Sequence, residues 1–585
     1  MNLRFLFPFV ALADASVVAG VADPGEENAK RQSSKLQKSL RLQRAGFWRL
    51  RFGIWSFQLR LLSALFIGHW SMVISADLAA AEFRLETATV AEINAAFDSG
   101  ALTSEKLVSL YLARIEAYDK KGPNLNSIIT LNPKALEQAR ALDAERKAKG
   151  PRSPLHGVVV LAKDVYDTAD LPTSGGFKPM ATSQPARDSF VIDRLRKAGA
   201  IILGKLNQSD WYGVPEVRSA STRIGPVTSP YNAKKSAGGS SSGTGVSMAA
   251  WLGTVGLGSD TSGSIVIPTQ RNGLVGFSTT HGLVSRTGMM WSSPSQESGG
   301  PMGRSVYDCA AVLDAIAGYD PADLVTQASV GKLPERPYIT FVSKSKDGLK
   351  GARLGVLRER FRSGPRHEEG NALAEKAFAD LKAAGAILVD PVLTGLKLTD
   401  PDVIMSADAS NYERGMAIDK YLAGLPATAP IRSVAEMIAK SGSTPVKPVI
   451  IESTKIRSLD RYPPFLAALK QQQVLRSALL EVMEKYQLDA IVLPYETKLI
   501  EDVPVPASTP SDIERNALAS FTGLPTILVP GGFYASDGMP FAMQFLGHPF
   551  AEPTLITIAS SYEAATKHRK APASTPALPG EKFDY

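Results

Sequence analysis

The sequence predicts an α/β fold in which a mixed, mostly parallel central sheet is covered by helices on both faces. Short apolar runs rich in Val, Ile and Leu are typical of strands buried on both sides. These runs alternate with segments of helical periodicity over about 500 residues, and that alternation is typical of a layered sheet. The chain has 585 residues, 44% hydrophobic and 21% charged, and no polar linker divides residues 82–585. We therefore expect a single domain there.

The expected elements follow in chain order. Two helical patterns come first, and the second has Pro133 at its first helical position and ends at Gly150. A helix, a glycine and a strand then follow one another twice, around Gly199 and Gly385. The expected helices cover 102–122, 132–150, 190–198, 305–317 and 374–384. The expected strands cover 157–163, 200–206, 353–357, 386–390, 489–494, 525–530 and 541–547.

Composition excludes several classes of protein. The single cysteine, Cys309, rules out an internal disulfide framework and a cysteine-based metal cluster, and its amphipathic helical setting predicts a core position. The net charge is +8, but residues 1–81 carry +5 of it, so the remaining 504 residues carry only +3 (8 − 5). A net charge this small over 504 residues does not indicate a nucleic-acid-binding protein.

Residues 1–81 form a separate N-terminal extension. Nine basic and no acidic residues lie between Lys30 and Arg60, and an apolar run ending in Ala79-Ala80-Ala81 follows. This order is typical of a secretory signal, and His69 and Asp77 make the run a poor membrane span. We therefore expect a periplasmic or secreted protein that begins near Glu82, with no stable membrane insertion. A cytoplasmic protein is the alternative if the extension is not a signal.

Residues 236–273 form a stretch rich in Gly and Ser, which could be a linker, a phosphate-binding loop or a catalytic segment. Its apolar middle, "VSMAAWLGTVGLG", argues against a flexible linker. No strand precedes it, and Thr244 stands where a phosphate-binding loop needs Lys. Residues 239–243 match the G-x-S-x-G nucleophile elbow, centred on Ser241, but that elbow also needs a preceding strand and a histidine partner. None of the six histidines has a recognisably catalytic setting.

A serine nucleophile without histidine needs another base, and a neutral lysine can serve. Burial lowers a lysine pKa by as much as about 3–5 units, so the base should lie beside a buried strand. Lys163 directly follows the run "HGVVVLA". The alternative, an ion pair between Lys163 and Asp164 at the strand end, is equally compatible with this local pattern.

The larger pattern resembles the amidase signature family. "AGGSSSG" is followed by "GSDTSGSIVIP", whose last serine lies 24 residues after Ser240, and "PLHGVVVLAKD" lies about 77 residues upstream of Ser240. "AIILGKLN", "GPMGRSVYD", "FTGLPTILVPGG" and "MPFAMQFLG" follow the family order too. The resemblance covers roughly residues 84–570.

The resemblance implies a role for each matching position. Lys163 is the base, Ser264 is the nucleophile, and Ser240 bridges them after a cis peptide bond with Gly239. Backbone N–H groups from Thr261 through Ser264 form the oxyanion hole. The site positions implied beside the catalytic trio are Gly239, Ser241, Thr261, Ser262 and Gly263.

The implied reaction is hydrolysis of a carboxamide C–N bond through an acyl-enzyme, without a metal or organic cofactor. The substrate would be a small-molecule or short-peptide amide, and the sequence leaves a homodimer open. Segment 211–221 and the insertion between Asp400 and Pro464 are expected to line the pocket. The alternatives are a glutaminase-type subunit of a tRNA-dependent amidotransferase and a non-catalytic binding protein on the same scaffold.

The sequence departs from the usual family pattern in three places. Ser262 stands where Gly is usual, and Val266 stands where Arg usually follows the Ser-Ile pair. The Val266 substitution removes an expected partner of Asp260. "GFSTT" replaces the usual Lys-Pro-Thr run. These differences resemble the branch near the peptide amidases and leave the trio intact.

Overall fold

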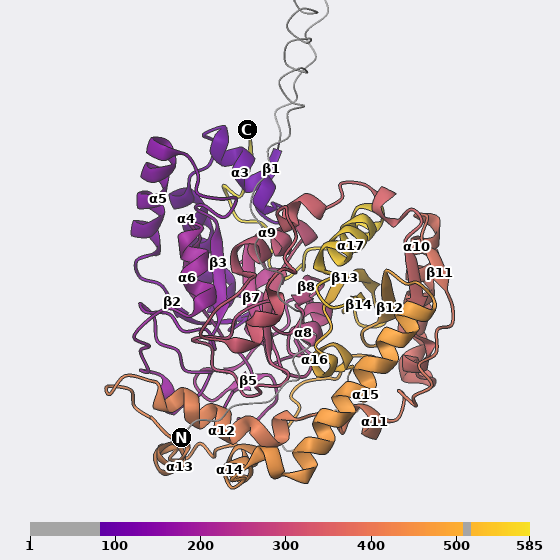
Figure 1. Cartoon of the computed structure of the whole chain (residues 1–585). Coiled ribbons are helices and arrows are strands. Elements are labelled where there is room, and N and C mark those ends of the chain that lie inside the picture. The colour runs from indigo at the N-terminus through magenta and orange to yellow at the C-terminus, as the bar shows by residue number, and fades with distance from the viewer. Residues whose placement is uncertain (1–81, 507–515) are drawn as a thin grey trace, which may run out of the picture. The chain divides into compact units, whose positions relative to one another are not determined.

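An eleven-stranded sheet crosses the centre of the computed structural model, which describes residues 82–506 and 516–585 (Figure 1). The strand order is β11-β10-β12-β14-β13-β8-β9-β7-β3-β4-β2. Two small two-stranded sheets, β1-β15 and β5-β6, accompany it. The strands are β1 Glu82–Arg84, β2 Ile128–Leu131, β3 Val159–Lys163, β4 Ile201–Leu206, β5 Ala220–Ser221, β6 Gly225–Pro226, β7 Val255–Asp260, β8 Val275–Ser278, β9 Ser298–Gly303, β10 Arg353–Val356, β11 Ile387–Val389, β12 Ala490–Pro494, β13 Thr526–Phe533, β14 Pro540–Leu546 and β15 Lys582–Asp584.

The mixed sheet is confirmed, but its parallel strands lie in two separate groups. β4-β3-β7 and β11-β10-β12 are parallel. Five antiparallel pairs join these groups through the centre, and together with the antiparallel edge pair β2-β4 they outnumber the parallel pairs by six to four among the described strands. The expectation of a mostly parallel sheet therefore fails at the centre. One reason is that β13 and β14 are consecutive strands joined by a short turn, and such a connection favours antiparallel pairing.

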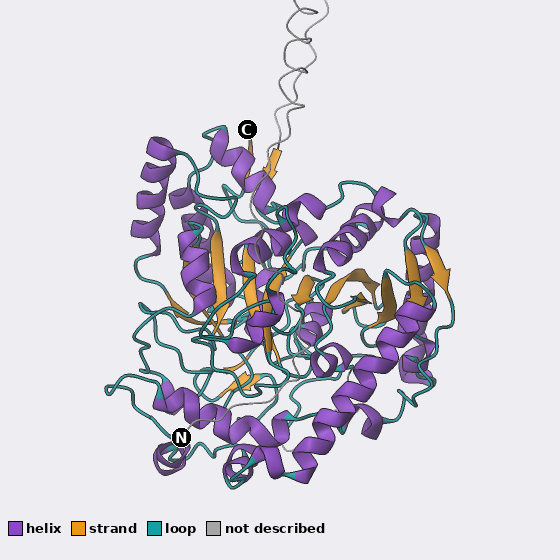
Figure 2. Cartoon of the chain, viewed as in Figure 1, coloured by secondary structure: helices purple, strands orange, loops and turns teal. Residues whose placement is uncertain are grey.

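Helices cover the sheet on both faces (Figure 2). Every residue of β3, β4, β7, β12 and β14 is buried, and successive side chains of a strand point to opposite faces, so neither face is open there. The helices are α3 Val90–Asp98, α4 Ser104–Arg114, α5 Ala135–Lys149, α6 Phe190–Lys197, α7 Ser242–Ala249, α8 Val266–Arg271, α9 Val306–Ile316, α10 Pro365–Ala383, α11 Pro401–Met405, α12 Ser410–Ala423, α13 Val434–Lys440, α14 Pro448–Thr454, α15 Pro463–Lys485, α16 Leu518–Thr522 and α17 Glu552–Thr566.

Two glycines mark the expected joins from helix to strand. Gly199 follows α6 with φ +92°, and Gly385 follows α10 with φ +101°. This left-handed region favours glycine because a Cβ would be strained there. At Gly199 a Cβ would also lie 2.9 Å from the Cα of His156. Both joins are therefore built as the sequence predicts.

Side-chain caps fix where several helices begin. The hydroxyl of Ser189 accepts the N–H of Ile192 at the start of α6, and that of Ser305 accepts the N–H of Asp308 at the start of α9. Such caps satisfy N–H groups that the first turn leaves unpaired. Cys309 lies in α9 and is fully buried, as its pattern predicts.

The insertion after residue 400 folds as a group of helices. α11 to α14 follow one another and lead into the long helix α15 (Figure 1). In the described part of the chain, no helix combines the length and the apolar character needed to cross a membrane. The N-terminal extension, residues 1–81, lies outside the described residues, so its predicted role as a signal stays a prediction.

A buried ion pair joins α4 to the residues just before β15. Arg114 Nη1 lies 2.8 Å from a carboxylate oxygen of Glu581, and both side chains are at most 2% exposed. The same guanidinium donates to the carbonyl oxygens of Ala250, Thr575 and Pro576 and stacks on Trp251 at 4.1 Å. Segments distant in the sequence are therefore held around one cation.

We expect Glu581→Gln to lower the apparent free energy of unfolding by about 3 kcal/mol. Removing one partner of a buried pair costs about 3–5 kcal/mol, and the three carbonyl acceptors keep the loss at the low end. Lys582→Gln is the control, because Lys582 and Glu82 form an exposed pair worth under about 1 kcal/mol. Urea unfolding followed by circular dichroism measures both variants. Equal losses of unfolding free energy in the two variants would show that the buried ion pair stabilises the protein no more than the exposed pair does.

Candidate active site

The centre of the site is the amino group of Lys163. Lys163 is the last residue of β3, its side chain is fully buried, and Nζ lies 2.6 Å from Ser240 Oγ. Nζ also donates to Ser259 Oγ at 2.9 Å, and it lies 5.1 Å from the centre of the Trp211 ring. Lys163 does not pair with Asp164, because Asp164 forms a buried ion pair with Lys205 at 3.3 Å.

Burial sets the proton affinity of Lys163. Loss of hydration lowers its pKa from 10.5 to about 7, although the carboxylates of Glu297 and Asp260 act in the opposite direction. The charge of Lys447 lowers it further. Burial disfavours the charged form of an amine, so a large fraction of Lys163 is neutral near pH 7. A neutral amine 2.6 Å from a hydroxyl can accept its proton.

The segment before Ser240 has the backbone conformation that the family resemblance implies. The peptide bond between Gly239 and Ser240 is cis, and Gly238 has φ +78°. A Cβ on Gly238 would lie 2.8 Å from Ile267 Cγ2, and one on Gly239 would lie 2.4 Å from Ser209 Oγ. The Ser240 carbonyl accepts the N–H of Ser209 at 3.0 Å. The side chains of nearby residues therefore leave little room at positions 238 and 239 for any residue but glycine.

Ser241 joins the segment to residues 260–265, the turn that carries the predicted nucleophile Ser264 and is called the nucleophile turn below. It is fully buried. Its N–H donates to the Ser264 carbonyl at 3.3 Å, and its hydroxyl makes 3.3 Å contacts with the backbone of Ser259. Ser241 thus joins the backbone of Ser264 to the segment that carries Ser240, and its own hydroxyl is occupied. This arrangement does not resemble a nucleophile elbow.

The described histidines lie in other networks. Each of the five hydrogen-bonds outside this cluster. They are His156 with Arg152 and Leu142, His281 with Arg286, His367 with Thr497, His548 with Leu488, and His568 with Asp380.

The nucleophile turn is held from inside by one carboxylate. Asp260 accepts the N–H of Gly263 at 2.6 Å and the N–H of Ile265 at 2.9 Å. The hydroxyl of Ser520, on α16, donates to Asp260 at 2.6 Å and lies 3.1 Å from the nitrogen of Gly263. Ser520 therefore supplies a partner for Asp260 in a sequence where Val266 replaces the usual Arg.

The N–H groups of the turn divide into two sets. Those of Gly263 and Ile265 are taken by Asp260. Within residues 82–506 and 516–585, those of Thr261, Ser262 and Ser264 have no hydrogen-bond acceptor. Ser262 and Ser264 are also partly exposed. Of the expected oxyanion positions, Gly263 is the one whose N–H is already engaged.

Four side chains around the turn were not predicted from the sequence. Ser259 contacts Lys163, Ser520 contacts Asp260, and Gln296 and Glu297 both contact Thr261. Three of these residues come from segments far from the turn in the sequence. The missing Arg after Ser264 was the one signal that Asp260 needs another partner.

The insertion is attached to the segment that carries Trp211. The N–H of Val214 donates to the Pro445 carbonyl at 2.9 Å, and the N–H of Lys447 donates to the Tyr212 carbonyl at 2.8 Å. Lys447 Nζ also bonds to the Asp210 carbonyl. The two segments expected to line the pocket are therefore joined beside Lys163.

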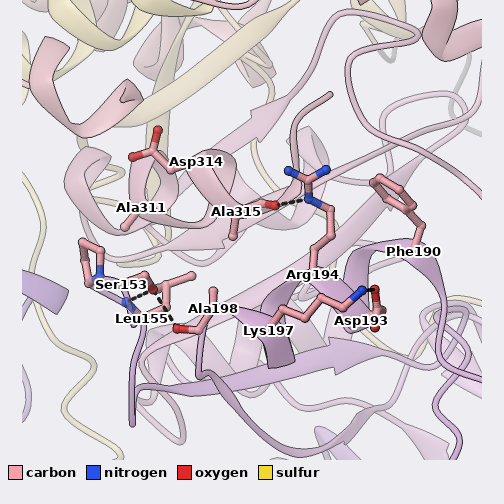
Figure 3. Close-up of a pocket in the computed structure, with 11 residues that line it drawn as sticks. Ser153, Leu155, Phe190, Asp193, Arg194, Lys197, Ala198, Ala311, Asp314 and Ala315 are labelled. Carbon is pink, nitrogen blue, oxygen red and sulfur yellow. Dashed lines mark hydrogen bonds and ion pairs between the residues drawn. The ribbon is translucent and has the colours of Figure 1, made fainter. Parts of the chain in front are cut away.

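A cavity of about 430 Å³ lies elsewhere, between α6 and α9. Figure 3 shows Leu155 and Ala311 at its walls and the ion pair of Lys197 with Asp193. Arg194 is tied to the Ala315 carbonyl at 2.7 Å. None of the predicted catalytic residues lines this cavity, so it is not part of the site around Lys163.

Residues 106–556 match the model of the Amidase family, and the chain belongs to that family. It is 35% identical over 518 residues to an Arabidopsis thaliana protein named "Probable amidase", covering 84% of this chain and 92% of that one. It is 32% identical to a glutamyl-tRNA(Gln) amidotransferase subunit of Moorella thermoacetica, covering 83% and 98%. The native peptide amidase of Stenotrophomonas maltophilia is 34% identical with a TM-score of 0.73, covering 83% and 99%. The protein is an amidase, an enzyme that hydrolyses amide bonds.

We expect Ser520→Ala to destabilise the enzyme by about 1–3 kcal/mol, because a buried carboxylate then loses a hydrogen-bond donor. The turn should also loosen, which lowers activity. Thermal unfolding and kcat measure the two effects. Ser520→Thr keeps the hydroxyl and should recover most of both. An alanine variant with unchanged unfolding and kcat would show that Ser520 does not support Asp260.

Proposed function

We propose that this amidase is a serine hydrolase in which Ser264 forms the acyl-enzyme and Lys163, through Ser240, moves the proton. One observation carries the proposal: the buried amine of Lys163, with its pKa lowered to about 7, lies 2.6 Å from the hydroxyl of Ser240. The backbone hydrogen bond from the Ser241 N–H to the Ser264 carbonyl, at 3.3 Å, joins the segment that carries Ser240 to the turn that carries Ser264, and it supports this assignment.

In the first half of the reaction, neutral Lys163 takes the proton of Ser240 while Ser240 takes the proton of Ser264. Ser264 Oγ attacks the amide carbonyl carbon, and the carbonyl oxygen becomes an oxyanion beside the N–H groups of Thr261, Ser262 and Ser264. The proton then passes back from Lys163 through Ser240 to the amide nitrogen, and the C–N bond breaks. Acid catalysis matters here because an amine leaves poorly without a proton.

In the second half, a water molecule takes the place of the amine. It gives its proton to the same relay and attacks the acyl carbon. The proton returns to Ser264 Oγ as the carboxylate leaves. Every step uses groups of this chain and water.

We propose a small-molecule or short-peptide carboxamide as the substrate. The likeness to the Stenotrophomonas maltophilia peptide amidase supports this class, as does the attachment of the insertion beside Trp211. A homodimer stays a prediction. The 32% identity to the amidotransferase subunit favours glutamine as a second candidate substrate. Ammonia release from free glutamine, compared with release from peptide amides, distinguishes the two.

We expect kcat/KM for a peptide amide to fall as the pH drops below about 7, because protonated Lys163 cannot act as the base. The pKa of Lys163 lies below its ordinary value, so activity is retained above that pH and lost below it. Lys163→Ala should reduce amide hydrolysis by about 10³-fold or more and abolish this acid limb. Hydrolysis of a p-nitrophenyl ester should suffer less, because the phenolate leaves without a proton.

Two further measurements test the same relay: covalent labelling of the nucleophile, and the activity of histidine variants. A fluorophosphonate probe should label Ser264, and Ser264→Ala should remain folded and unlabelled. Labelling at Ser241 would favour the elbow. If His281→Ala or His156→Ala, still folded, lost as much activity as Lys163→Ala, the relay would be wrong.

We further propose export of the protein, with processing near Glu82. The support is the order of the N-terminal residues: a basic segment, an apolar run and Ala79-Ala80-Ala81. Sequencing the N-terminus of the protein purified from its native cell should show a start near Glu82. A cytoplasmic chain that begins upstream of Leu61 would contradict the proposal.

A further inference from the structure

Two consecutive side chains hold Thr261, the residue that opens the nucleophile turn. Gln296 Nε2 donates to the Thr261 carbonyl at 2.8 Å, and the Thr261 hydroxyl donates to Glu297 at 2.6 Å. Gln296 and Glu297 directly precede β9, and β9 pairs with β7, which ends at Asp260. Thr261 is therefore fixed at both its main chain and its side chain.

The amide of Gln296 is held in one orientation. It is 1% exposed. Its nitrogen donates to Thr261 and, at 3.0 Å, to the carboxylate of Asp408. Its oxygen accepts the N–H of Ala409 at 3.1 Å and Nε2 of Gln472 at 3.0 Å. Rotation of the amide by 180° would set donors against donors and acceptors against acceptors, so the surroundings permit only this orientation.

The consequence for the turn comes from the planarity of the peptide bond. The Thr261 carbonyl and the Ser262 N–H belong to one rigid trans unit and point in opposite directions. Gln296 holds the carbonyl, so the Ser262 N–H must point to the other side. That N–H has no acceptor among the residues that the structure describes, which suits a donor reserved for a ligand.

We propose that Gln296 is a positioning residue of the oxyanion hole: by holding the Thr261 carbonyl, it aims the Ser262 N–H at the oxygen that becomes negative during attack. The inference rests on the proposed function of Ser264. Asp260 holds the neighbouring peptide units through Gly263 and Ile265. Gln296 completes the support from the opposite end of the turn.

Gln296 also links the turn to two elements that lie outside the central sheet. Asp408 and Ala409 directly precede α12 of the insertion, and Gln472 lies on α15. Gln472 is bonded in turn to the Ala407 carbonyl at 3.0 Å. The first residues of α12 and the middle of α15 therefore take part in orienting a backbone donor of the active site.

The test compares Gln296→Met with the parent enzyme. Methionine has a similar length but neither donates nor accepts strongly. With p-nitrophenyl butyrate as the substrate, we expect kcat to fall about 10–100-fold, less than the 10²–10³-fold typical of losing a donor outright, with KM little changed. The rate of fluorophosphonate labelling at Ser264 should fall in parallel. The acid limb of the pH profile should stay in place, because the surroundings of Lys163 are unaltered.

Asn132→Leu is the matched control. Asn132 is also a buried amide, and it donates to the Ile202 carbonyl at 2.8 Å near the edge strand β2, away from the turn. Its variant should lose stability while kcat and labelling remain at parent values. A loss of kcat equal to that of Gln296→Met would show that any buried amide has this effect, and would overturn the proposal.

A second variant covers the case in which Gln296→Met does not fold. Gln472→Met leaves the bond from Gln296 to Thr261 but removes one of the groups that orient the amide, so kcat and labelling should fall severalfold. Parent values in a folded Gln296→Met, or in Gln472→Met if Gln296→Met does not fold, would overturn the inference. If the parent enzyme itself is not labelled at Ser264, the proposed function fails instead, and the two failures are thereby separated.

Discussion

The proposed chemistry depends on a lysine amine that can lose its charge inside the protein near neutral pH. Lys163 is fully buried at the end of an interior strand, and burial is the largest of the effects that lower its pKa to about 7. The sheet makes this burial possible, because β3 lies between β4 and β7 with every residue covered. An edge strand would leave the lysine hydrated and protonated. The position of the lysine in the sheet therefore decides whether it can act as a base.

Two buried carboxylates oppose this effect of burial. Asp260 and Glu297 both favour the protonated form of Lys163, and Glu297 has an oxygen, Oε1, that accepts no hydrogen bond from the described residues. Burial in turn raises the pKa of Glu297, whereas its hydrogen bond from Thr261 and the charge of Lys163 lower it. The resulting pKa of about 7 for Lys163 is close to the value at which a base combines availability with driving force.

The helices and strands that were predicted correctly are those whose own residues show a simple pattern, such as a run of β-branched side chains. The β-branched runs at β3, β4 and β12 gave the correct strands, and Lys163 was found because it follows such a run. β9, "SGGPMG", was missed because it lacks a strand composition. A Cβ on Gly300 would lie 1.9 Å from the Phe277 carbonyl oxygen. The close approach of strand β8 therefore requires glycine at this position. The direction of the central strands was missed because pairing depends on connections rather than on composition.

The same distinction applies to the site. Lys163, Ser240 and Ser264 lie in segments whose spacing is visible in the sequence, and the structure brings these segments together. Ser520 and Gln296 were missed because each is one polar residue in a segment with another evident role. Their partners, Asp260 and Thr261, lie 260 and 35 residues away in the chain. Nothing in a local pattern marks such a residue.

The supports of the nucleophile turn come in part from residues outside the turn. Short turns leave several peptide units without partners inside the turn, and each unit can rotate unless something holds it. Here Asp260 holds two N–H groups, and Gln296 holds one carbonyl. With these units fixed from outside, Ser262 can stand where glycine is usual, because the direction of its N–H no longer depends on its own side chain. The turn is therefore held in part by residues that lie outside it, and Ser520 on α16 donates to the carboxylate for which the usual arginine is missing.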